Sequence, residues 1–210
     1  MELLRHGGKS ILFIMAVEAE YGEHLRRRFK PLITGVGPVE AAIAAAHTLA
    51  EFSGRGGLPD LIVSLGSAGS RKLEQANVYQ ASSVSFRDMD ASPLGFEKGV
   101  TPFLDLPAVL DLPLRVPEVE TASLSTGANI VSGAAYDTIE ADMVDMETFA
   151  IMRAAMRFNV PLVALRGISD GAAELHRIDD WTEYLHIVDE NLGQAVDRLL
   201  AAVGEARIQL

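Results

Sequence analysis

Short apolar runs alternate with longer segments of helical pattern along this chain, and the alternation restricts the fold more than any other feature. The segment 60–66, DLIVSLG, is apolar almost without interruption, as expected for a strand that is covered on both faces. The runs with strand character lie at residues 10–17, 31–37, 60–66, 76–86, 121–127 and 161–169. The helical segments lie at residues 18–29, 39–52, 147–158 and 181–203. Strands that alternate with helices predict an α/β layered domain with a mixed or mostly parallel sheet.

A single domain of residues 1–210 is expected. A chain of 210 residues can bury a substantial core, and its composition, 49% hydrophobic and 22% charged, is typical of a globular protein rather than a disordered one. The Gly- and Pro-rich stretches at 54–59 and 92–117 are interpreted as loops, because neither divides the chain into two plausible cores. Residues 1–9 are expected to form a leader before the first strand.

The acidic balance and the cysteine content restrict partners and compartment. A net charge of −11 disfavours nucleic acid and anionic membranes, which need a basic face. The chain has no cysteine, which removes disulfides, thiol nucleophiles and thiolate metal sites and suits a reducing compartment. The early apolar run at 11–17 is too short to span a membrane and is followed by Glu18 rather than by a cleavage site. We therefore expect a cytoplasmic protein whose charge is compatible with a small neutral or cationic ligand.

Neither a cofactor nor a metal is predicted. The GVG at 35–37 resembles the start of a dinucleotide-binding fingerprint, but Glu40 stands where the third glycine would be and would face the pyrophosphate, so a tight turn is favoured. The basic run 26–28 is interpreted as a solvated helix end, with a phosphate-binding role as the alternative. The histidines have no metal-ligand spacing. They are His6, His24, His47, His176 and His186.

Acidic residues stand at the ends of three predicted strands. FIMAVEAE ends in Glu20, VDMETFA carries Glu147 at a strand-to-helix junction, and LRGISDG ends a strand at Asp170. Because ligands bind at strand ends in open α/β sheets, the three acids are expected to converge on one crevice. For any one acid alone, the opening of a helix or a turn is the simpler explanation, so the prediction depends on finding three together. The same segments supply further candidate residues: Glu18, Asp145, Arg166 and Ser169.

A run of small residues follows the apolar segment at 60–66. SLGSAGS, residues 64–70, lets the backbone approach a ligand closely and presents a hydroxyl together with backbone amides. Ser67, Ala68 and Gly69 are therefore candidate ligand contacts, with a plain turn of small residues as the alternative.

Six short motifs occur in a fixed order along the chain: AVEAE, TGVGPVEAA, SLGSAGS, VSGAAY, VDMETFAI and RGISD. Together they resemble the 5′-methylthioadenosine/S-adenosylhomocysteine nucleosidase family, which is part of the purine nucleoside phosphorylase superfamily. The resemblance covers residues 11–203, and the pair VDMET and RGISD is its distinctive part. It implies a three-layer α/β/α domain with a mixed central sheet, a nucleoside substrate, no cofactor and a homodimer.

The resemblance also implies roles for residues in these motifs. Glu20 would position and activate the attacking water, and Ser67 and Arg166 would help to hold that water. Met146 and Glu147 would contact the ribose, with the glutamate accepting hydrogen bonds from its hydroxyls. Asp145 joins them as a candidate substrate contact.

A second group of residues would handle the leaving base. Asp170, supported by Ser169, would protonate adenine at N7, and Tyr136 would stack on the base. Trp181 and Tyr184 would close the site over the substrate, or would simply be helix-packing aromatics. An acid at the base and a water on the opposite face suit cleavage through a sugar with oxocarbenium character. Asp170 must then hold a proton near neutral pH, which requires burial or a shared hydrogen bond.

Hydrolysis is favoured over phosphorolysis. In phosphorylases of this superfamily the first strand typically leads into a Gly-Asp-Pro-x-x-Arg type loop. Here the position reads AVEAE, and Glu20 would repel phosphate and suit a water. The expected reaction is hydrolysis of the N-glycosidic bond of a 5′-substituted adenosine of the methylthioadenosine or S-adenosylhomocysteine type. The alternatives are a phosphate-dependent purine nucleoside phosphorylase and a non-catalytic, nucleoside-binding member of the superfamily.

Three positions depart from the family pattern. Ala134 stands where an acid is expected, and Asp137 takes the place of an aliphatic residue beside the base, where it either alters base preference or opens the following helix. Arg87 replaces a histidine in the segment RDMD, in a region that packs at the family's dimer interface and lends apolar residues to the partner's 5′ pocket. The segment that follows, as far as Val116, is short and proline-rich, so the preferred 5′ substituent stays open.

Overall fold

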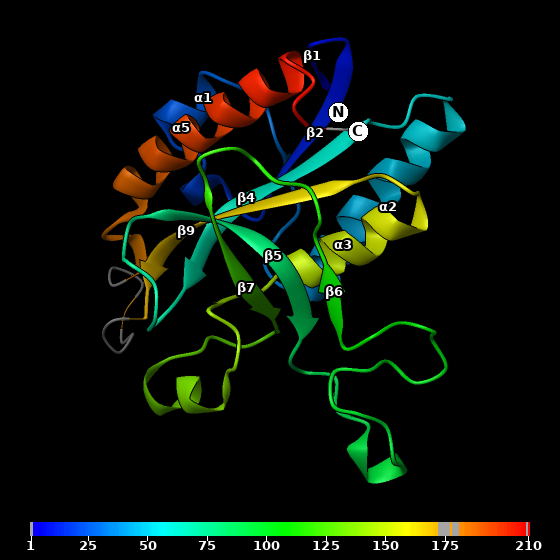
Figure 1. The fold of residues 1–210 in the computed structure, drawn as a ribbon, viewed down its shortest axis with the longest axis vertical. Coiled ribbons are helices and arrows are strands. Elements are labelled where there is room, and N and C mark those ends of the chain that lie inside the picture. Colours follow the sequence, from blue (N-terminus) through cyan, green and yellow to red (C-terminus); the bar gives the residue numbers. More distant parts are fainter. Residues whose placement is uncertain (1, 172–176, 178–180, 209) are drawn as a thin grey trace.

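Helices cover both faces of one mixed sheet. The computed structural model describes residues 2–171, 177, 181–208 and 210. In Figure 1 the long helix α5 (Leu185–Gly204) and the short α1 (Glu23–Arg26) lie on one side of the sheet, and α2 (Pro38–Gly54) and α3 (Thr148–Arg157) lie on the other. The arrangement confirms the predicted three-layer α/β/α architecture with a mixed central sheet.

Part of the sheet closes into a ring. The strands are β1 (Leu4–His6), β2 (Lys9–Met15), β3 (Leu32–Ile33), β4 (Leu61–Gly69), β5 (Val78–Phe86), β6 (Val109–Asp111), β7 (Glu120–Thr126), β8 (Met143–Asp145) and β9 (Leu162–Asp170). β9 runs parallel to β4 on one side and antiparallel to β5 on the other. Because β5 also pairs with β7, β7 with β8, and β8 with β4, these strands enclose a small interior. β2 extends the sheet outward from β4 and carries β1 and β3.

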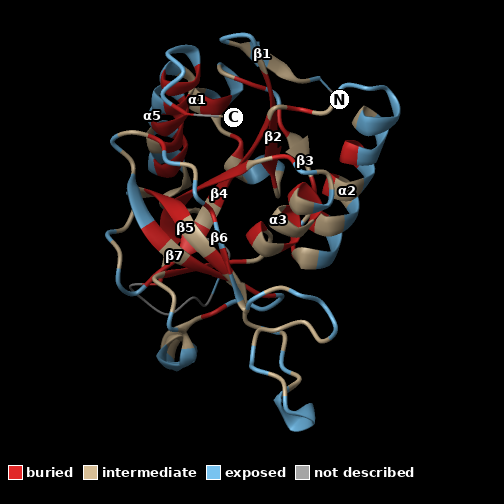
Figure 2. Ribbon diagram, turned by 45° about the vertical axis from the view of Figure 1, so that its right-hand side comes forward, coloured by how far each residue is buried: buried red, intermediate tan, exposed pale blue. Residues whose placement is uncertain are grey.

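Two apolar cores lie on the two sides of the sheet, and β2 divides its side chains between them. Leu12 and Ile14 pack in the core that includes α2 and α3, whereas Ile11 and Phe13 pack in the core that includes α1 and α5. Buried residues are concentrated in the central strands (Figure 2). A strand that is covered on both faces needs no polar alternation, which explains the continuous apolar run at its position.

The first predicted helix is wrong. Residues 18–29 form a 3-10 turn, η1 (Glu18–Glu20), and then the short α1, with Gly22 between them. A Cβ at Gly22 would lie 2.5 Å from the Asp189 carboxyl group, which accepts backbone N–H groups of His24 and Leu25 at 2.8 and 3.1 Å. α1 is therefore capped by a side chain of α5, and this long-range contact has no sequence signal.

Other boundaries also differ from prediction. The strand expected at 31–37 is reduced to β3. β4 continues through Gly69, so the small-residue run 64–70 belongs largely to the strand and is not a plain turn. The last helix begins at Leu185 rather than at 181. The expected leader contains β1, which pairs antiparallel with β2.

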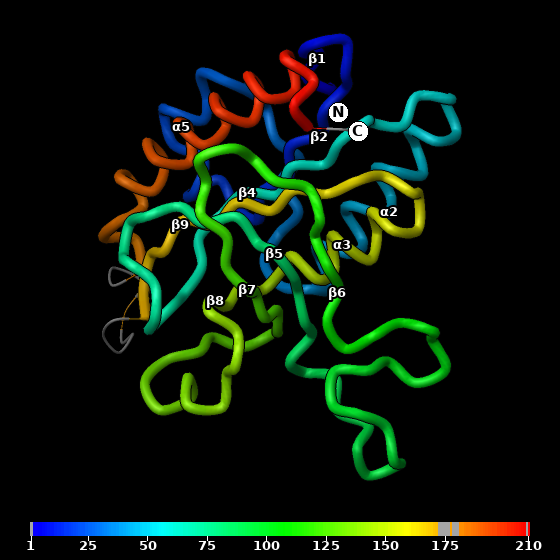
Figure 3. The backbone as a smooth tube through the Cα atoms, in the orientation of Figure 1, coloured from blue at the N-terminus to red at the C-terminus, as the bar shows by residue number. Residues whose placement is uncertain are grey.

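An extended loop between β5 and β6 projects from the body of the molecule (Figures 1 and 3). We call residues 87–108 the arm; it contains the 3-10 turn η2 (Ser92–Leu94). Its apolar side chains include Leu94, 80% exposed, and Phe103, 95% exposed. Among the described residues, no helix is both long enough and apolar enough to cross a membrane.

Candidate active site

Glu20 is anchored on the end of β4. Ser67 donates both its backbone N–H and its hydroxyl to Oε1 of Glu20, at 2.9 and 2.5 Å. Gly66 permits this approach, because a Cβ there would lie only 3.0 Å from Oε2. Burial raises the pKa of Glu20, against the lowering effects of the Ser67 hydrogen bonds and the Arg166 charge. A carboxylate in such a place is a stronger proton acceptor than one in water.

Trp181 reaches the same corner. Its indole N–H donates to the Ser67 hydroxyl oxygen at 3.0 Å, so Ser67 lies between Glu20 and Trp181. This hydrogen bond to Ser67 supports the expected placement of Trp181 at the site. Tyr184 lies half-buried immediately before α5, and its role in closing the site stays a prediction.

Glu147 joins two helix starts. It is the last residue before α3, and its Oε1 accepts the backbone N–H of Gly37 at 2.8 Å, directly before α2. Gly37 has φ +95°, so the GVG segment forms the tight turn that was expected of it. Burial, followed by the charge of Asp145, raises the pKa of Glu147 to about 7, although the Gly37 N–H and Arg166 act in the opposite direction. The carboxylate is poised to accept further hydrogen bonds near neutral pH.

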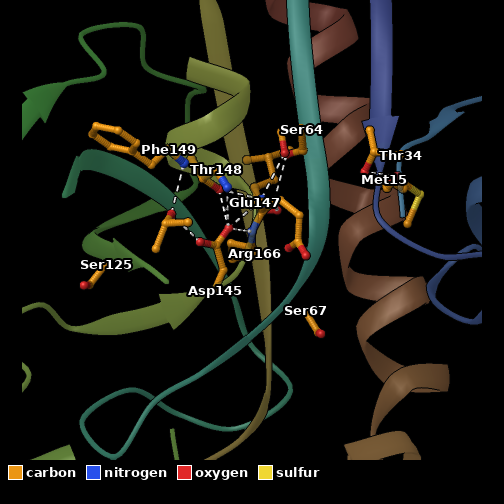
Figure 4. A network of polar contacts seen from close by, with 12 residues as sticks. Met15, Thr34, Ser64, Ser67, Ser125, Asp145, Glu147, Thr148, Phe149 and Arg166 are labelled. Atoms are coloured by element: carbon orange, nitrogen blue, oxygen red, sulfur yellow. Dashed lines mark hydrogen bonds and ion pairs between the residues drawn. The ribbon is translucent and has the colours of Figure 1, made fainter. Parts of the chain in front are cut away.

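Arg166 lies inside the ring of strands, and Figure 4 shows its side chain close to Asp145 and Thr148. It is 2% exposed, and its Nε and Nη2 donate to Oδ2 of Asp145 at 3.1 and 3.0 Å. The remaining N–H groups are engaged by Ser64, Thr148 and the Leu165 carbonyl. Arg166 was expected to hold the water; with its donors used in this way, it acts on Glu20 and Glu147 through its charge instead.

Asp145 is the partner that fixes Arg166. It is 5% exposed, and besides Arg166 it accepts the Thr126 hydroxyl at 2.6 Å and the Thr148 backbone N–H at 3.0 Å. The expectation that Asp145 contacts substrate is corrected by this geometry, because both carboxylate oxygens are committed within the protein. It thereby links the end of β7 and the middle of β9 to the start of α3.

Asp170 ends β9 beside the last residues of β4. Ser169 donates its hydroxyl to Oδ2 of Asp170 at 2.7 Å. Burial raises the pKa of Asp170, against the lowering effects of Ser169 and Tyr136. A Cβ at Gly69 would meet the Tyr136 hydroxyl and would lie 2.7 Å from Oδ1 of Asp170, so only glycine allows these side chains to gather here. The structure thus gives Asp170 the burial that proton retention requires.

Other predicted contacts are placed less directly. Ala68 is 3% exposed, and its carbonyl accepts the Ser169 hydroxyl at the long distance of 3.5 Å. Met146 is half-buried between β8 and α3. Asp137 forms an ion pair with Arg71 on the surface, with Nη1 of the arginine 2.9 Å from Oδ1 of the aspartate.

Arg87 was not predicted to shape the site, although its sequence position marked it as a departure. Its guanidinium donates to the carbonyls of Ser125 and Asp145 at 2.6 and 3.0 Å and to the carbonyl of Asn129 at 2.7 Å. A Cβ at Gly127 would collide with it. Arg87 therefore holds the loop after β7 against the end of β8. No cluster of three or more potential metal ligands occurs among the described residues, and His176 lies outside them.

A mixed sheet that closes on itself, with carboxyl groups gathered at the ends of its strands, defines a nucleoside phosphorylase-like domain. The family model described as "Phosphorylase superfamily" matches residues 119–201. A Haemophilus influenzae 5′-methylthioadenosine/S-adenosylhomocysteine nucleosidase is 32% identical over 67% of this chain and 67% of its own, and a Staphylococcus aureus enzyme of the same name is 30% identical over 68% and 69%. The chain belongs to the 5′-methylthioadenosine/S-adenosylhomocysteine nucleosidase family.

Solved structures agree on the fold. The nucleosidase of Neisseria meningitidis in complex with methylthio-immucillin-A has a TM-score of 0.75 at 24% identity, covering 91% of this chain and 98% of that one. The Colwellia psychrerythraea nucleosidase in complex with adenine has a TM-score of 0.76 at 22% identity, covering 97% and 98%. A Helicobacter pylori futalosine hydrolase is also similar, with a TM-score of 0.73 at 16% identity, covering 91% and 98%.

Proposed function

We propose that this protein hydrolyses the N-glycosidic bond of a 5′-substituted adenosine of the methylthioadenosine or S-adenosylhomocysteine type, releasing adenine and a 5′-substituted ribose. The proposal rests on family membership and, above all, on the anchoring of Glu20 by Ser67. The pair presents a fixed carboxylate to the attacking nucleophile. A carboxylate suits water as the nucleophile, whereas phosphate would need cationic side chains.

Glu20 activates the attacking water. The carboxylate accepts a proton from water while the oxygen of that water bonds to C1′ of the ribose. Ser67 fixes Oε1, so the direction of the carboxylate is set before substrate binds. Preorganisation of this kind lowers the cost of reaching the transition state.

The ribose lies between the two reacting groups in this proposal. Glu147 accepts hydrogen bonds from the ribose hydroxyls, and Met146 packs against the sugar. Because the pKa of Glu147 is about 7, a large part of the population is ionised at neutral pH. The negative charge also favours the positive charge that develops on the sugar as the C1′–N9 bond breaks.

Asp170 acts on the base. Its carboxyl proton passes to N7 of adenine as the C1′–N9 bond breaks, and the bonding electrons leave with the base, which departs neutral. Burial supports this role because it raises the pKa of Asp170, and the Ser169 hydroxyl, which acts against that shift, holds Oδ2 in place by a hydrogen bond. General acid catalysis from one positioned carboxyl group contributes about 10²- to 10⁴-fold.

A panel of nucleosides tests the activity and separates it from passive binding. Methylthioadenosine, S-adenosylhomocysteine, 5′-deoxyadenosine and futalosine are incubated with the protein, and free base is measured by chromatography. We expect adenine from at least one 5′-thio-substituted nucleoside. Binding without base release from any of them would instead favour a non-catalytic module, and turnover of futalosine alone would move the substrate class toward the more distant structural relative.

We further propose a homodimer in the cytoplasm. Apolar side chains are exposed on and before α2, with Val36, Val39 and Ile43 at 53, 65 and 61% exposure, and the arm adds Leu94 and Phe103. Exposed apolar groups of this kind are typical of a surface that a partner covers. The lack of cysteine supports a reducing compartment. Light scattering on the eluting protein tests the dimer, and a monomeric mass at micromolar concentration would contradict it.

A further inference from the structure

The hydroxyl of Tyr136 is buried at the base end of the site without a hydrogen-bond partner in the described part of the chain. It lies over Gly69 together with Oδ1 of Asp170. Burial raises the pKa of Tyr136, and the charge of Asp170 and a weak polar interaction with its carboxyl group act in the same direction. The contact between the two side chains nevertheless lacks the distance and angle of a hydrogen bond, so the hydroxyl has capacity for a better partner. A buried hydroxyl left unpaired destabilises the fold, so its persistence at this position points to a ligand that satisfies it.

The position of Tyr136 is fixed from outside. The residue belongs to the 3-10 segment η3 (Gly133–Thr138), and Arg71 donates to the Gly133 carbonyl at 3.1 Å and to Asp137 Oδ1 at 2.9 Å. The same guanidinium lies 5.9 Å from the centroid of the tyrosine ring. The ring is therefore held by its neighbours, and the hydroxyl is not needed to anchor it.

The two side chains offer a purine different hydrogen-bonding groups. A protonated Asp170 donates to N7 through one oxygen, and its other oxygen accepts from an amino group at C6. An oxo group at C6 is an acceptor only, so it finds no donor in that second oxygen. A tyrosine hydroxyl can accept from an amino group or rotate its hydrogen to donate to an oxo group.

We propose that the Tyr136 hydroxyl reads the C6 position of the base and extends the substrates of this site to 5′-substituted nucleosides of 6-oxopurines. The inference rests on the proposed function, since it assumes that the base binds at Asp170. A phenylalanine would fill the same space without offering either hydrogen bond. Tyr136 is thus a specificity-determining residue, and its hydroxyl matters more for the oxo than for the amino substrate, for which the Asp170 acceptor remains.

The test compares Tyr136→Phe with the unmodified protein on methylthioadenosine and methylthioinosine, which differ in the group at C6 and in the hydrogen that the oxo form carries on N1. We expect the unmodified protein to cleave both, and the variant to lose about 10-fold more kcat/KM on methylthioinosine than on methylthioadenosine, as expected for one hydrogen bond. Tyr79→Phe is the matched control, because it removes a hydroxyl that accepts the Glu74 backbone N–H at 3.3 Å outside the site. It should leave the ratio unchanged.

Equilibrium binding of adenine and hypoxanthine, measured by calorimetry, gives a second readout that needs no turnover. The same shift of about 10-fold against hypoxanthine is expected in Tyr136→Phe. Base binding with this shift but without hydrolysis would reject the proposed function and keep the recognition of the C6 group by Tyr136. Three results would overturn the inference: equal losses on both purines, no binding of either base, or no recognition of 6-oxopurines by the unmodified protein. Each of these results is compatible with adenine release from methylthioadenosine, which would still uphold the proposed function.

Discussion

The Glu147 carboxylate accepts the backbone N–H of Gly37 at 2.8 Å, and this contact joins the start of α3 to the turn before α2. The acid is kept in this place although burial and the neighbouring charge of Asp145 raise its pKa to about 7. The native state therefore binds the Glu147 proton more tightly than the unfolded chain does. Between the ordinary pKa of a glutamate and about 7, stability falls as pH rises.

Replacing Glu147 by glutamine should stabilise the fold above neutral pH. Glu147→Gln removes the charge but keeps an oxygen that accepts the Gly37 N–H. We expect the free energy of unfolding to increase on the order of 1–3 kcal/mol at pH 8, where the native carboxylate is ionised, with little change at pH 4.5, where it is protonated. Urea denaturation at both pH values measures this. A loss of stability at pH 8 would show that the ionised carboxylate stabilises the fold.

Removing the anchor of Glu20 should slow chemistry more than binding. Ser67→Ala deletes the hydroxyl that binds Glu20 and receives the Trp181 N–H. We expect kcat to fall by about 10-fold or more while KM changes little, because the lost hydrogen bond orients the proton acceptor. Ser10 pairs its backbone N–H and its hydroxyl with an acid, Asp60, in the same way but outside the site, and Ser10→Ala removes only the hydroxyl. Equal effects of the two variants on kcat would argue against the role of Ser67.

The proton on Asp170 should be indispensable. Asp170→Asn keeps the shape of the side chain but cannot transfer a proton, so kcat should fall by about 10²- to 10⁴-fold with the unfolding temperature nearly unchanged. Asp60→Asn, at a partly exposed carboxylate outside the site, should keep full turnover. Appreciable residual activity in Asp170→Asn would assign the proton to another group.

The buried pair of Arg166 and Asp145 should carry stability. Arg166→Met leaves Asp145 buried and uncompensated, which is expected to cost about 3–5 kcal/mol of unfolding free energy. Arg207→Met breaks an exposed pair with Glu205 and should cost less than about 1 kcal/mol. Chemical denaturation of both variants tests this. Similar small losses would mean that Arg166 is dispensable to the ring of strands.

The sequence could predict the layers and the gathering of acids because both follow local rules. The continuous apolar runs required strands covered on both faces, and Glu20 and Asp170 each follow such a run, whereas Glu147 was located by the strand-to-helix junction of VDMETFA. The partners of Arg166 could not be predicted, since they depend on β9 closing the ring between β4 and β5. The short α1 likewise depends on a carboxylate of α5, 164 to 165 positions away along the chain.

The phosphate dependence of base release tests the central claim most directly. In the proposed reaction Glu20 activates water, whereas binding of phosphate would require cations with free donors. The charge of Arg166 acts on Glu20, but the N–H groups of Arg166 are engaged within the protein. Adenine release from methylthioadenosine is measured in phosphate-free buffer and again with added phosphate, and phosphorus NMR follows the sugar product. We predict equal rates and free methylthioribose in both. Turnover that requires phosphate and yields a ribose 1-phosphate would contradict the assignment of this site to hydrolysis.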